Sequence, residues 1–215
     1  MKIELRNVTK KIKGNVVLNK INLEFEGGKI YGLWGKNGSG KTMLMRTICG
    51  LIHPTEGEIF IDGKQLGKDM SFPNSVGVLI ENPAFIDNFS GYRNLKILAD
   101  LTGKIDGETV KKWIAKVGLN PDDKKKYKKY SLGMKQRLGI AAAIMEEPEI
   151  ILLDEPINAL DEGGVQEIRE VLLELRDRNR VIIIACHDRE ELETLSDEII
   201  ELYEGNITKK MHQSI

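Results

Sequence analysis

Residues 30–42 read IYGLWGKNGSGKT, and this stretch decides the fold. Its first part, residues 30–34, is almost continuously apolar, which is typical of a buried parallel strand. Its second part, residues 35–42, matches the pattern G-x-x-x-x-G-K-[ST], and a helical pattern that carries Leu44 and Ile48 follows. The order strand, glycine-rich loop and helix is the context that identifies a phosphate-binding loop. We therefore predict an α/β fold with a parallel sheet.

The loop supplies the groups that a nucleoside triphosphate with Mg²⁺ requires. Its glycines let consecutive backbone N–H groups surround phosphates, and the helix that follows adds the positive end of its dipole. Lys41 supplies a charge to the β- and γ-phosphates, and the Thr42 hydroxyl is a Mg²⁺ ligand. We expect a P-loop NTPase core that binds ATP and Mg²⁺. The expected nucleotide-binding residues of the loop are Gly35, Asn37, Gly38, Ser39, Gly40, Lys41 and Thr42.

A second apolar strand ends in two carboxylates. Residues 150–153 are apolar, and Asp154 and Glu155 follow directly, so both side chains should lie at the carboxyl edge of the sheet, where ligands of such folds bind. Asp154 would belong to the Mg²⁺ shell, and Glu155 would deprotonate the attacking water as general base. When an apolar strand that ends in Asp-Glu is seen alone, the two carboxylates are more often solvent-exposed residues without a catalytic role. Beside a phosphate-binding loop the catalytic interpretation is favoured.

The remaining patterns extend this core. Ile3 and Leu5 alternate with polar residues, as do Ile21, Leu23 and Phe25, which indicates an antiparallel sheet; residues 93–145 turn helical. Apolar residues 181–185 follow a helical stretch, as in a βαβ unit. We expect a single domain of residues 1–215. In it, residues 1–81 and 147–215 form the nucleotide-binding core with an antiparallel β-subdomain, and residues 82–146 form an inserted helical subdomain.

The charge, cysteine and hydrophobic content of the chain exclude several classes of partner and location. The chain of 215 residues carries 32 Lys and Arg against 33 Asp and Glu, so no overall basic field would attract nucleic acid, and we expect no nucleic-acid partner. Cys49 and Cys186 match no metal-ligand spacing and fit a reducing cytosol. No apolar run approaches the roughly 20 residues of a membrane span, and we expect no signal peptide. The lysines of residues 124–129 are predicted to form a solvated loop.

Beyond these motifs, the sequence resembles the ATP-binding-cassette family over nearly its whole length. Residues 131–137, SLGMKQR, resemble the family signature: Ser131 and Gly133 match, whereas Leu132 and Met134 replace the usual Gly and Gln. Seen alone, Ser131 predicts a capped helix whose free N–H groups form an anion site. The resemblance implies that Ser131 and Gly133 meet the γ-phosphate of the nucleotide bound by a second subunit.

Two further segments resemble family motifs. Residues 158–161, NALD, look like the D-loop, and the resemblance places Asp161 at the dimer interface beside the nucleotide. His187 follows the apolar strand 181–185 and looks like the switch histidine, which contacts the γ-phosphate. A lone histidine at a strand end is more often structural. Its position after the last core strand favours the catalytic interpretation.

Two positions depart from the family pattern. Glu81 stands where the family usually has Gln, and the resemblance gives it a catalytic role with contacts to water or Mg²⁺. Together with SLGMKQRL at residues 131–138, this variant resembles the subgroup associated with export of, and immunity to, lantibiotics and bacitracin-like peptides. Ile12 stands where the family usually stacks an aromatic ring on adenine, so Ile12 and Val17 offer the base only apolar contact.

The resemblance implies an ATPase that powers transport. Two copies, a homodimer, would enclose two ATP-Mg²⁺ and drive a separate transmembrane permease, which would hold this cytoplasmic protein on the inner face of the cell membrane. One alternative is a soluble cassette ATPase that acts on ribosomes or DNA; the near-zero net charge and the single cassette disfavour it. A second alternative is an interaction module that binds nucleotide without turnover; Glu155 disfavours it.

Overall fold

The structure, a computed structural model, describes residues 1–177 and 179–212. Its central sheet has six strands in the order β10-β9-β3-β8-β7-β6. Their bounds are β3 (Lys29–Trp34), β6 (Val76–Leu79), β7 (Ile150–Asp154), β8 (Val181–Cys186), β9 (Glu198–Tyr203) and β10 (Asn206–His212). All neighbours in this sheet pair in parallel except β10, which runs antiparallel to β9. The predicted parallel core is confirmed.

A second, antiparallel sheet has the strand order β2-β1-β4-β5. Its strands are β1 (Lys2–Ile12), β2 (Asn15–Glu26), β4 (Glu56–Ile61) and β5 (Lys64–Gln65). Ile3 and Leu5 of β1 are buried, and they pair with Phe25 and Leu23 of β2. The alternation seen in the sequence thus places one face of this sheet against the core, as predicted.

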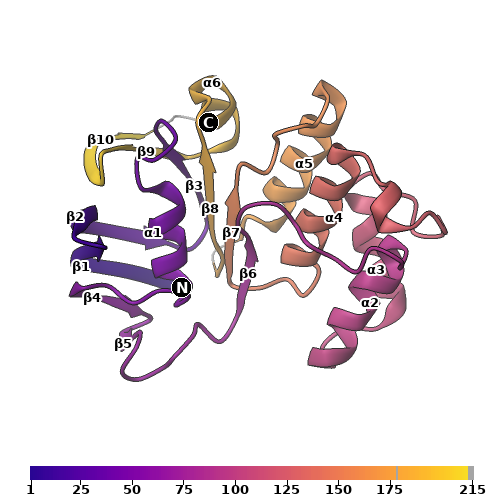
Figure 1. Cartoon of the computed structure of the whole chain (residues 1–215), viewed down its shortest axis with the longest axis horizontal. Coiled ribbons are helices and arrows are strands. Elements are labelled where there is room, and N and C mark those ends of the chain that lie inside the picture. Colours follow the sequence, from indigo (N-terminus) through magenta and orange to yellow (C-terminus); the bar gives the residue numbers. More distant parts are fainter. Residues whose placement is uncertain (178, 213–215) are drawn as a thin grey trace.

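The helices fall into two groups (Figure 1). Helix α1 (Lys41–Ile48) lies between the two sheets, whereas α5 (Glu162–Leu175) and α6 (Arg189–Leu195) follow β7 and β8 in the chain. The other helices are inserted between β6 and β7. They are α2 (Gly91–Thr102), α3 (Gly107–Lys116), the short 3-10 helix η1 (Tyr127–Lys129) and α4 (Leu132–Ile144). The predicted helical insert is present, and its boundaries at residues 82 and 146 remain a prediction.

The central sheet is covered on both faces, which explains why its strands are apolar without alternation. Ile182 and Ile184 of β8 belong to a buried cluster that includes side chains of α2, α3, α4 and α5. Ile183 and Ala185 of the same strand belong to the cluster formed with α1 and the antiparallel sheet. The sheet is therefore a rigid platform, and its carboxyl edge is the place where side chains converge.

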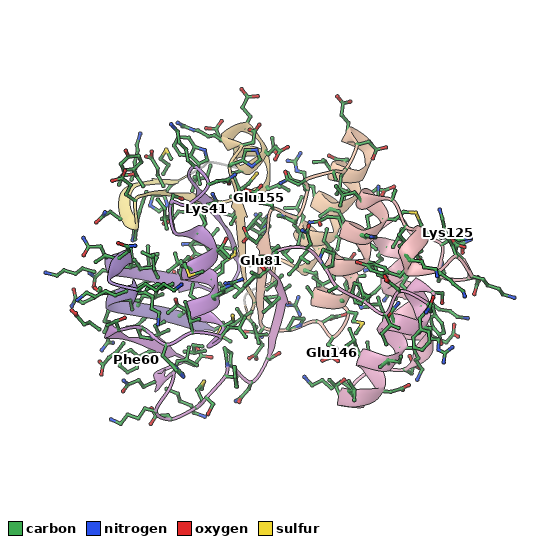
Figure 2. The ribbon with its side chains drawn as sticks, viewed as in Figure 1. Lys41, Phe60, Glu81, Lys125, Glu146 and Glu155 are labelled. Carbon is green, nitrogen blue, oxygen red and sulfur yellow. The ribbon has the colours of Figure 1, made fainter. Side chains whose placement is uncertain are left out.

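Two sequence predictions about exposed lysines and membrane spans can be compared with the described residues. The lysines at positions 124, 125, 126, 128 and 129 are exposed as predicted, while Tyr127 and Tyr130 are buried; residues 127–129 form the short helix η1 rather than a loop. Figure 2 shows Lys125 at the outer end of the helical insert. Within residues 1–177 and 179–212, no helix combines the length and the apolar character that crossing a membrane requires.

Candidate functional site

The carboxyl ends of three central strands meet at one edge of the sheet. Trp34 of β3 lies opposite Cys186 of β8, and Asp154 of β7 lies opposite Ala185. The segments that follow these residues therefore start side by side, although about 120 residues separate β3 from β7 in the chain. Figure 2 shows Lys41, Glu155 and Glu81 gathered near the centre of the molecule.

The phosphate loop requires glycine at two of its positions. Gly35 has φ 154°, and a Cβ there would lie 2.3 Å from the carbonyl oxygen of Leu202. Gly40 has φ 109°, and its Cβ would lie 2.9 Å from the carbonyl oxygen of Val17. Gly40 is also the N-cap of α1 and offers no side chain, so the first N–H groups of this helix lack a side-chain cap. They are available to an anion.

Two buried polar groups of the loop fit an anionic ligand. Lys41 is only 5% exposed, and its ammonium donates to the backbone carbonyls of Gly35 and Lys36. The buried Ser39 hydroxyl has no hydrogen-bond partner among the described residues. Buried polar groups are normally paired, so an unpartnered hydroxyl beside a buried ammonium fits a site for phosphate oxygens.

Asp154 joins the acidic strand end to the phosphate loop. The Thr42 hydroxyl donates a hydrogen bond of 2.6 Å to its carboxylate, and Asp154 is only 8% exposed. Burial raises the pKa of Asp154 above its ordinary value, although the Thr42 hydrogen bond acts in the opposite direction. A buried carboxylate beside a hydroxyl is the donor set that a hard divalent cation such as Mg²⁺ prefers. These two residues therefore fit the predicted metal-binding role.

Replacing Asp154 by asparagine should stabilise the ligand-free protein at pH 7. Because the pKa is raised on folding, the stability linked to this group is present below about pH 4, its unfolded value, and is lost as the pH rises and the carboxylate ionises. Asparagine can still accept from Thr42 and carries no charge. We expect the melting temperature in EDTA to rise by about 2–4 °C, the effect of roughly 1 kcal/mol in a chain of this size. Calorimetric melting of both proteins measures it.

The same comparison at low pH is the internal control. The difference between wild type and Asp154→Asn should shrink as the pH approaches 4, because the wild-type carboxylate then becomes protonated. A variant that melts lower than wild type at pH 7 without nucleotide would contradict the assigned direction of the shift.

Glu155 and His187 form a direct pair. The Nδ1 atom of His187 lies 2.9 and 3.1 Å from the two carboxylate oxygens of Glu155. Glu155 is one of the few non-glycine residues with a left-handed backbone (φ 50°), and its N–H donates to the carbonyl of Ala185. Cys186 is buried at the end of β8, where burial raises its pKa and its thiol donates to Glu191.

A pocket of about 350 Å³ connects the phosphate loop to the strand end, a volume in the range of small-molecule sites. Its apolar wall contains Ile12 and Val17, and its floor contains Asp154 and Glu155. The other lining residues are Asn37, Gly38, Ser39, Gly40, Lys41, Thr42 and Met43. The structure thus brings together the predicted base-contacting, phosphate-binding and acidic residues.

Glu81 lines an adjacent hollow that shares Asp154 and Glu155 with this pocket. Its carboxylate forms an ion pair of 2.5 Å with Arg46 of α1. Its backbone is left-handed, with φ 63°. The expected Mg²⁺-contacting residue is therefore next to the site, with its charge engaged by an arginine.

Ser131, Gly133 and Asp161 lie apart from the phosphate pocket and line a separate hollow. Ser131 is the N-cap of α4 and accepts from the Met134 N–H, as predicted from its sequence position. Asp161 is the N-cap of α5 and accepts from the Gly164 N–H. Within one chain, the structure does not bring these three residues to the phosphate loop.

Two residues at the site had no predicted role. Arg46 pairs with Glu81, and Gln136 of α4 donates through Nε2 to the backbone carbonyl of Glu155 at 2.9 Å. Both contacts join residues that lie at least 19 positions apart, and neither has a local sequence signal. The sequence predicts that Gln136 lies on the helix that begins after Ser131, but it does not predict its contact with Glu155.

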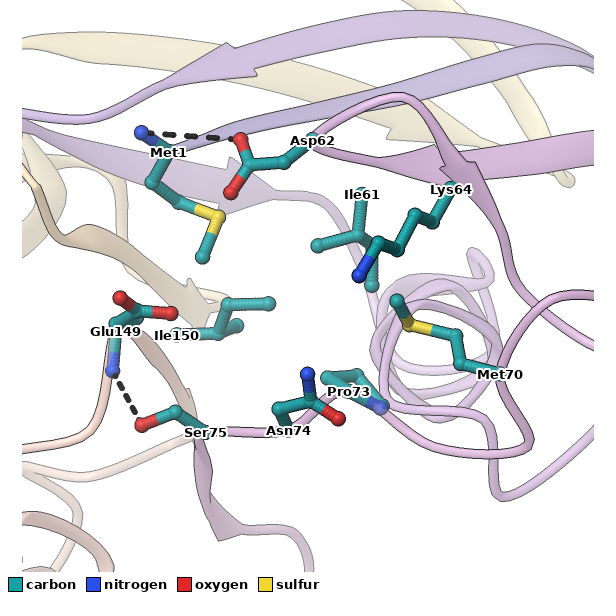
Figure 3. A pocket seen from close by; sticks show the side chains of 10 residues that line it. All are labelled: Met1, Ile61, Asp62, Lys64, Met70, Pro73, Asn74, Ser75, Glu149 and Ile150. Carbon is teal, nitrogen blue, oxygen red and sulfur yellow. Dashed lines mark hydrogen bonds and ion pairs between the residues drawn. The ribbon is translucent and has the colours of Figure 1, made fainter.

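A smaller hollow, of about 90 Å³, lies at the opposite end of the sheet, beneath the starts of β6 and β7 (Figure 3). The amino group of Met1 pairs with Asp62 on one side, and the Glu149 N–H donates to Ser75 on the other. Its volume is below that of ordinary ligand pockets, and it contains no residue of the phosphate loop. This hollow is therefore not a candidate for the nucleotide site.

Comparison with known proteins agrees with this geometry. The family model described as "ABC transporter" matches residues 18–158. The chain is 49% identical over 205 residues to the uncharacterised ABC transporter ATP-binding protein YybJ of Bacillus subtilis (strain 168), covering 95% of this chain and 94% of YybJ. It is 44% identical to the bacitracin transport ATP-binding protein BcrA of Enterococcus faecalis, covering 99% of this chain and 70% of BcrA.

Further similarity extends to a second antibiotic-related protein and to solved structures. The chain is 37% identical to the lantibiotic transport ATP-binding protein SrtF of Streptococcus pyogenes, covering 95% of this chain and 88% of SrtF. The dimeric bacterial ABC transporter cassette MJ0796 superimposes with a TM-score of 0.88 at 25% identity, covering 99% of each chain.

Proposed function

The chain belongs to the ABC transporter family, and on that premise we propose that it is the ATP-binding and ATP-hydrolysing subunit of a transporter whose permease is a separate polypeptide. The observation that carries the proposal is the hydrogen bond from Thr42 to Asp154, with Glu155 directly after it. It joins a phosphate loop to an acidic strand end, which is the arrangement needed for phosphoryl transfer to water.

The proposed roles follow from the contacts. Lys41 and the loop N–H groups would hold the phosphates, and Thr42 and Asp154 would hold Mg²⁺, which neutralises charge that develops on the phosphate oxygens. Glu155 would accept the proton of the attacking water as general base. His187, hydrogen-bonded to Glu155, would orient its carboxylate and contact the γ-phosphate. Glu81, released from Arg46, would reach the metal or a water bound to it.

We propose a homodimer as the working state. Ser131, Gly133 and Asp161 line their own hollow at the surface, away from the phosphate pocket of the same chain. A second copy would bring its Ser131 and Gly133 to this pocket, where the start of α4 offers backbone N–H groups to the γ-phosphate. Each nucleotide would then lie between two chains, so ATP binding would close the pair and hydrolysis would reopen it.

The transported substrate class is proposed from the relatives. BcrA is named for bacitracin transport and SrtF for lantibiotic transport, and Glu81 together with SLGMKQRL resembles that subgroup. We propose export of a peptide antibiotic or a similar molecule. The permease would hold this chain on the inner face of the cell membrane, and residues 82–146 would transmit the motion as one helical unit.

The test is affinity purification of the tagged chain from membranes of its own cells, with phosphate release measured with Mg²⁺ and with EDTA. We expect Mg²⁺-dependent ATP hydrolysis and co-purification of a polytopic membrane protein. Recovery with ribosomes or DNA, or ATP binding without phosphate release, would contradict the proposal.

A separate prediction concerns the adenine. Ile12 and Val17 provide no aromatic ring, so most binding energy should come from the triphosphate and Mg²⁺, which ATP and GTP share. We expect wild type to bind GTP within about tenfold of ATP. The change Ile12→Tyr should tighten binding by about 0.5–1.5 kcal/mol, the range for aromatic pairs.

Titration of both nucleotides against both proteins measures this effect. Val16→Tyr is a matched control, because Val16 is also exposed but does not line the pocket. A hundredfold preference of wild type for ATP, with no effect of the tyrosine at position 12, would show that another residue contacts the base.

A further inference from the structure

The backbone of Glu155 is held in an unusual conformation by two separate elements. Its φ of 50° lies in the left-handed region, which non-glycine residues rarely adopt and which persists only where the surroundings enforce it. On one side, its N–H donates to the Ala185 carbonyl of β8 at 2.8 Å. On the other side, its carbonyl accepts from the Gln136 side chain of α4 at 2.9 Å. The direction of the Glu155 carboxylate depends on this backbone.

Gln136 is suited to such a role by its burial and by its chemistry. The residue is only 7% exposed, although glutamine is usually found at the surface. Its partner is a carbonyl oxygen, which can only accept, so the amide must present its N–H group. A buried, oriented amide that makes this contact is a fixed part of the site.

The helix that carries Gln136 is itself firmly anchored. The next residue, Arg137, donates to the Val117 carbonyl at the end of α3 and forms an ion pair with Glu167 of α5. Five residues before Gln136, Ser131 caps the same helix. One rigid helix therefore joins the cap at Ser131 to the backbone of Glu155.

We propose that Gln136 is a positioning residue for the general base Glu155, and that through α4 it connects the base of one nucleotide site to Ser131, which serves the other. The inference rests on the proposed function, because it assigns a partner to the proposed base. Engagement of Ser131 by the nucleotide of the second subunit would hold α4 in place, and the Gln136 amide would then hold Glu155 in its left-handed conformation. In each chain, nucleotide bound at the site that Ser131 serves would thus favour the catalytic conformation of Glu155 at the other site.

The test replaces Gln136 by methionine, which has a similar length and no N–H donor. Turnover should fall about 10- to 100-fold, because small displacements of a reacting group have effects of this size. The affinity of ATP should stay within about twofold, since the phosphate loop and Thr42 do not contact Gln136. A closed dimer should accumulate with ATP, because Ser131 is unchanged and only hydrolysis is slowed. Damage to the fold alone would weaken the dimer instead.

Two comparisons make the test specific. Gln166→Met is the matched control, because Gln166 is an exposed glutamine of α5 that donates to Glu170 on the same helix, and its turnover should equal that of wild type. In a Glu155→Gln background, Gln136→Met should lower turnover by less than twofold, because both changes act through one group.

The outcomes separate this inference from the proposed function. If wild type does not hydrolyse ATP, the proposed function is wrong. If wild type hydrolyses ATP and Gln136→Met turns over within threefold of it, the positioning role is wrong. A second variant, Gln136→Glu, points an acceptor at the carbonyl and should be slower than the methionine variant while retaining ATP binding; a faster rate would also overturn the role.

Discussion

Glu155→Gln is expected to slow ATP hydrolysis about 100-fold or more while ATP binding stays near normal, so that a closed dimer accumulates. The size follows from the usual contribution of a general base. Glutamine has the shape of glutamate and can still contact His187 through its amide, but it does not accept the proton of water. The backbone bonds of residue 155 to Ala185 and Gln136 do not involve the changed group. Binding and catalysis should therefore separate in this variant.

Phosphate release and size-exclusion chromatography with and without ATP measure the two effects. Glu170→Gln is the control, because Glu170 is an exposed carboxylate of α5 that contacts Gln166 on the same helix. A Glu155→Gln protein that hydrolyses ATP within about threefold of wild type would remove Glu155 from the role of base.

The parts of the site that were predictable from sequence are those with local signals. The apolar strand, the loop of residues 35–42 and the following helix are consecutive, so pattern and spacing sufficed to predict them. Asp154 and Glu155 directly follow a buried strand, and parallel strands end at the same edge of a sheet, which is why their meeting with Thr42 could be anticipated. Ser131 was predictable as an N-cap for the same local reason.

The contacts that were not predicted depend on tertiary packing. Arg46 meets Glu81, and Gln136 meets Glu155, across separations that carry no periodic signal. The sequence also does not predict the left-handed backbone conformation of Glu81 and Glu155, because glutamate has no preference for the left-handed region. Family resemblance supplied roles for both glutamates but not the side chains that hold them.

Lys41→Ala is expected to lower ATP affinity at least about 30-fold and to leave the fold intact. Its ammonium is buried and donates to the carbonyls of Gly35 and Lys36, and a charge-assisted contact from such a group to phosphate contributes about 2 kcal/mol or more. Folding should lose little, because removal of a buried charge also removes its desolvation cost.

Titration calorimetry and thermal melting test both halves of this expectation, with Lys68→Ala as the control, an exposed lysine that does not line the pocket. If Lys41→Ala melts as wild type does and binds ATP with unchanged affinity, the buried ammonium contributes neither to the fold nor to nucleotide binding. The phosphates would then be held by backbone N–H groups and the start of α1 alone. If affinity falls while melting is unchanged, the contacts of the ammonium with the loop carbonyls offset the cost of burying it, and its net contribution is to the bound nucleotide, as expected for a site built for an anion.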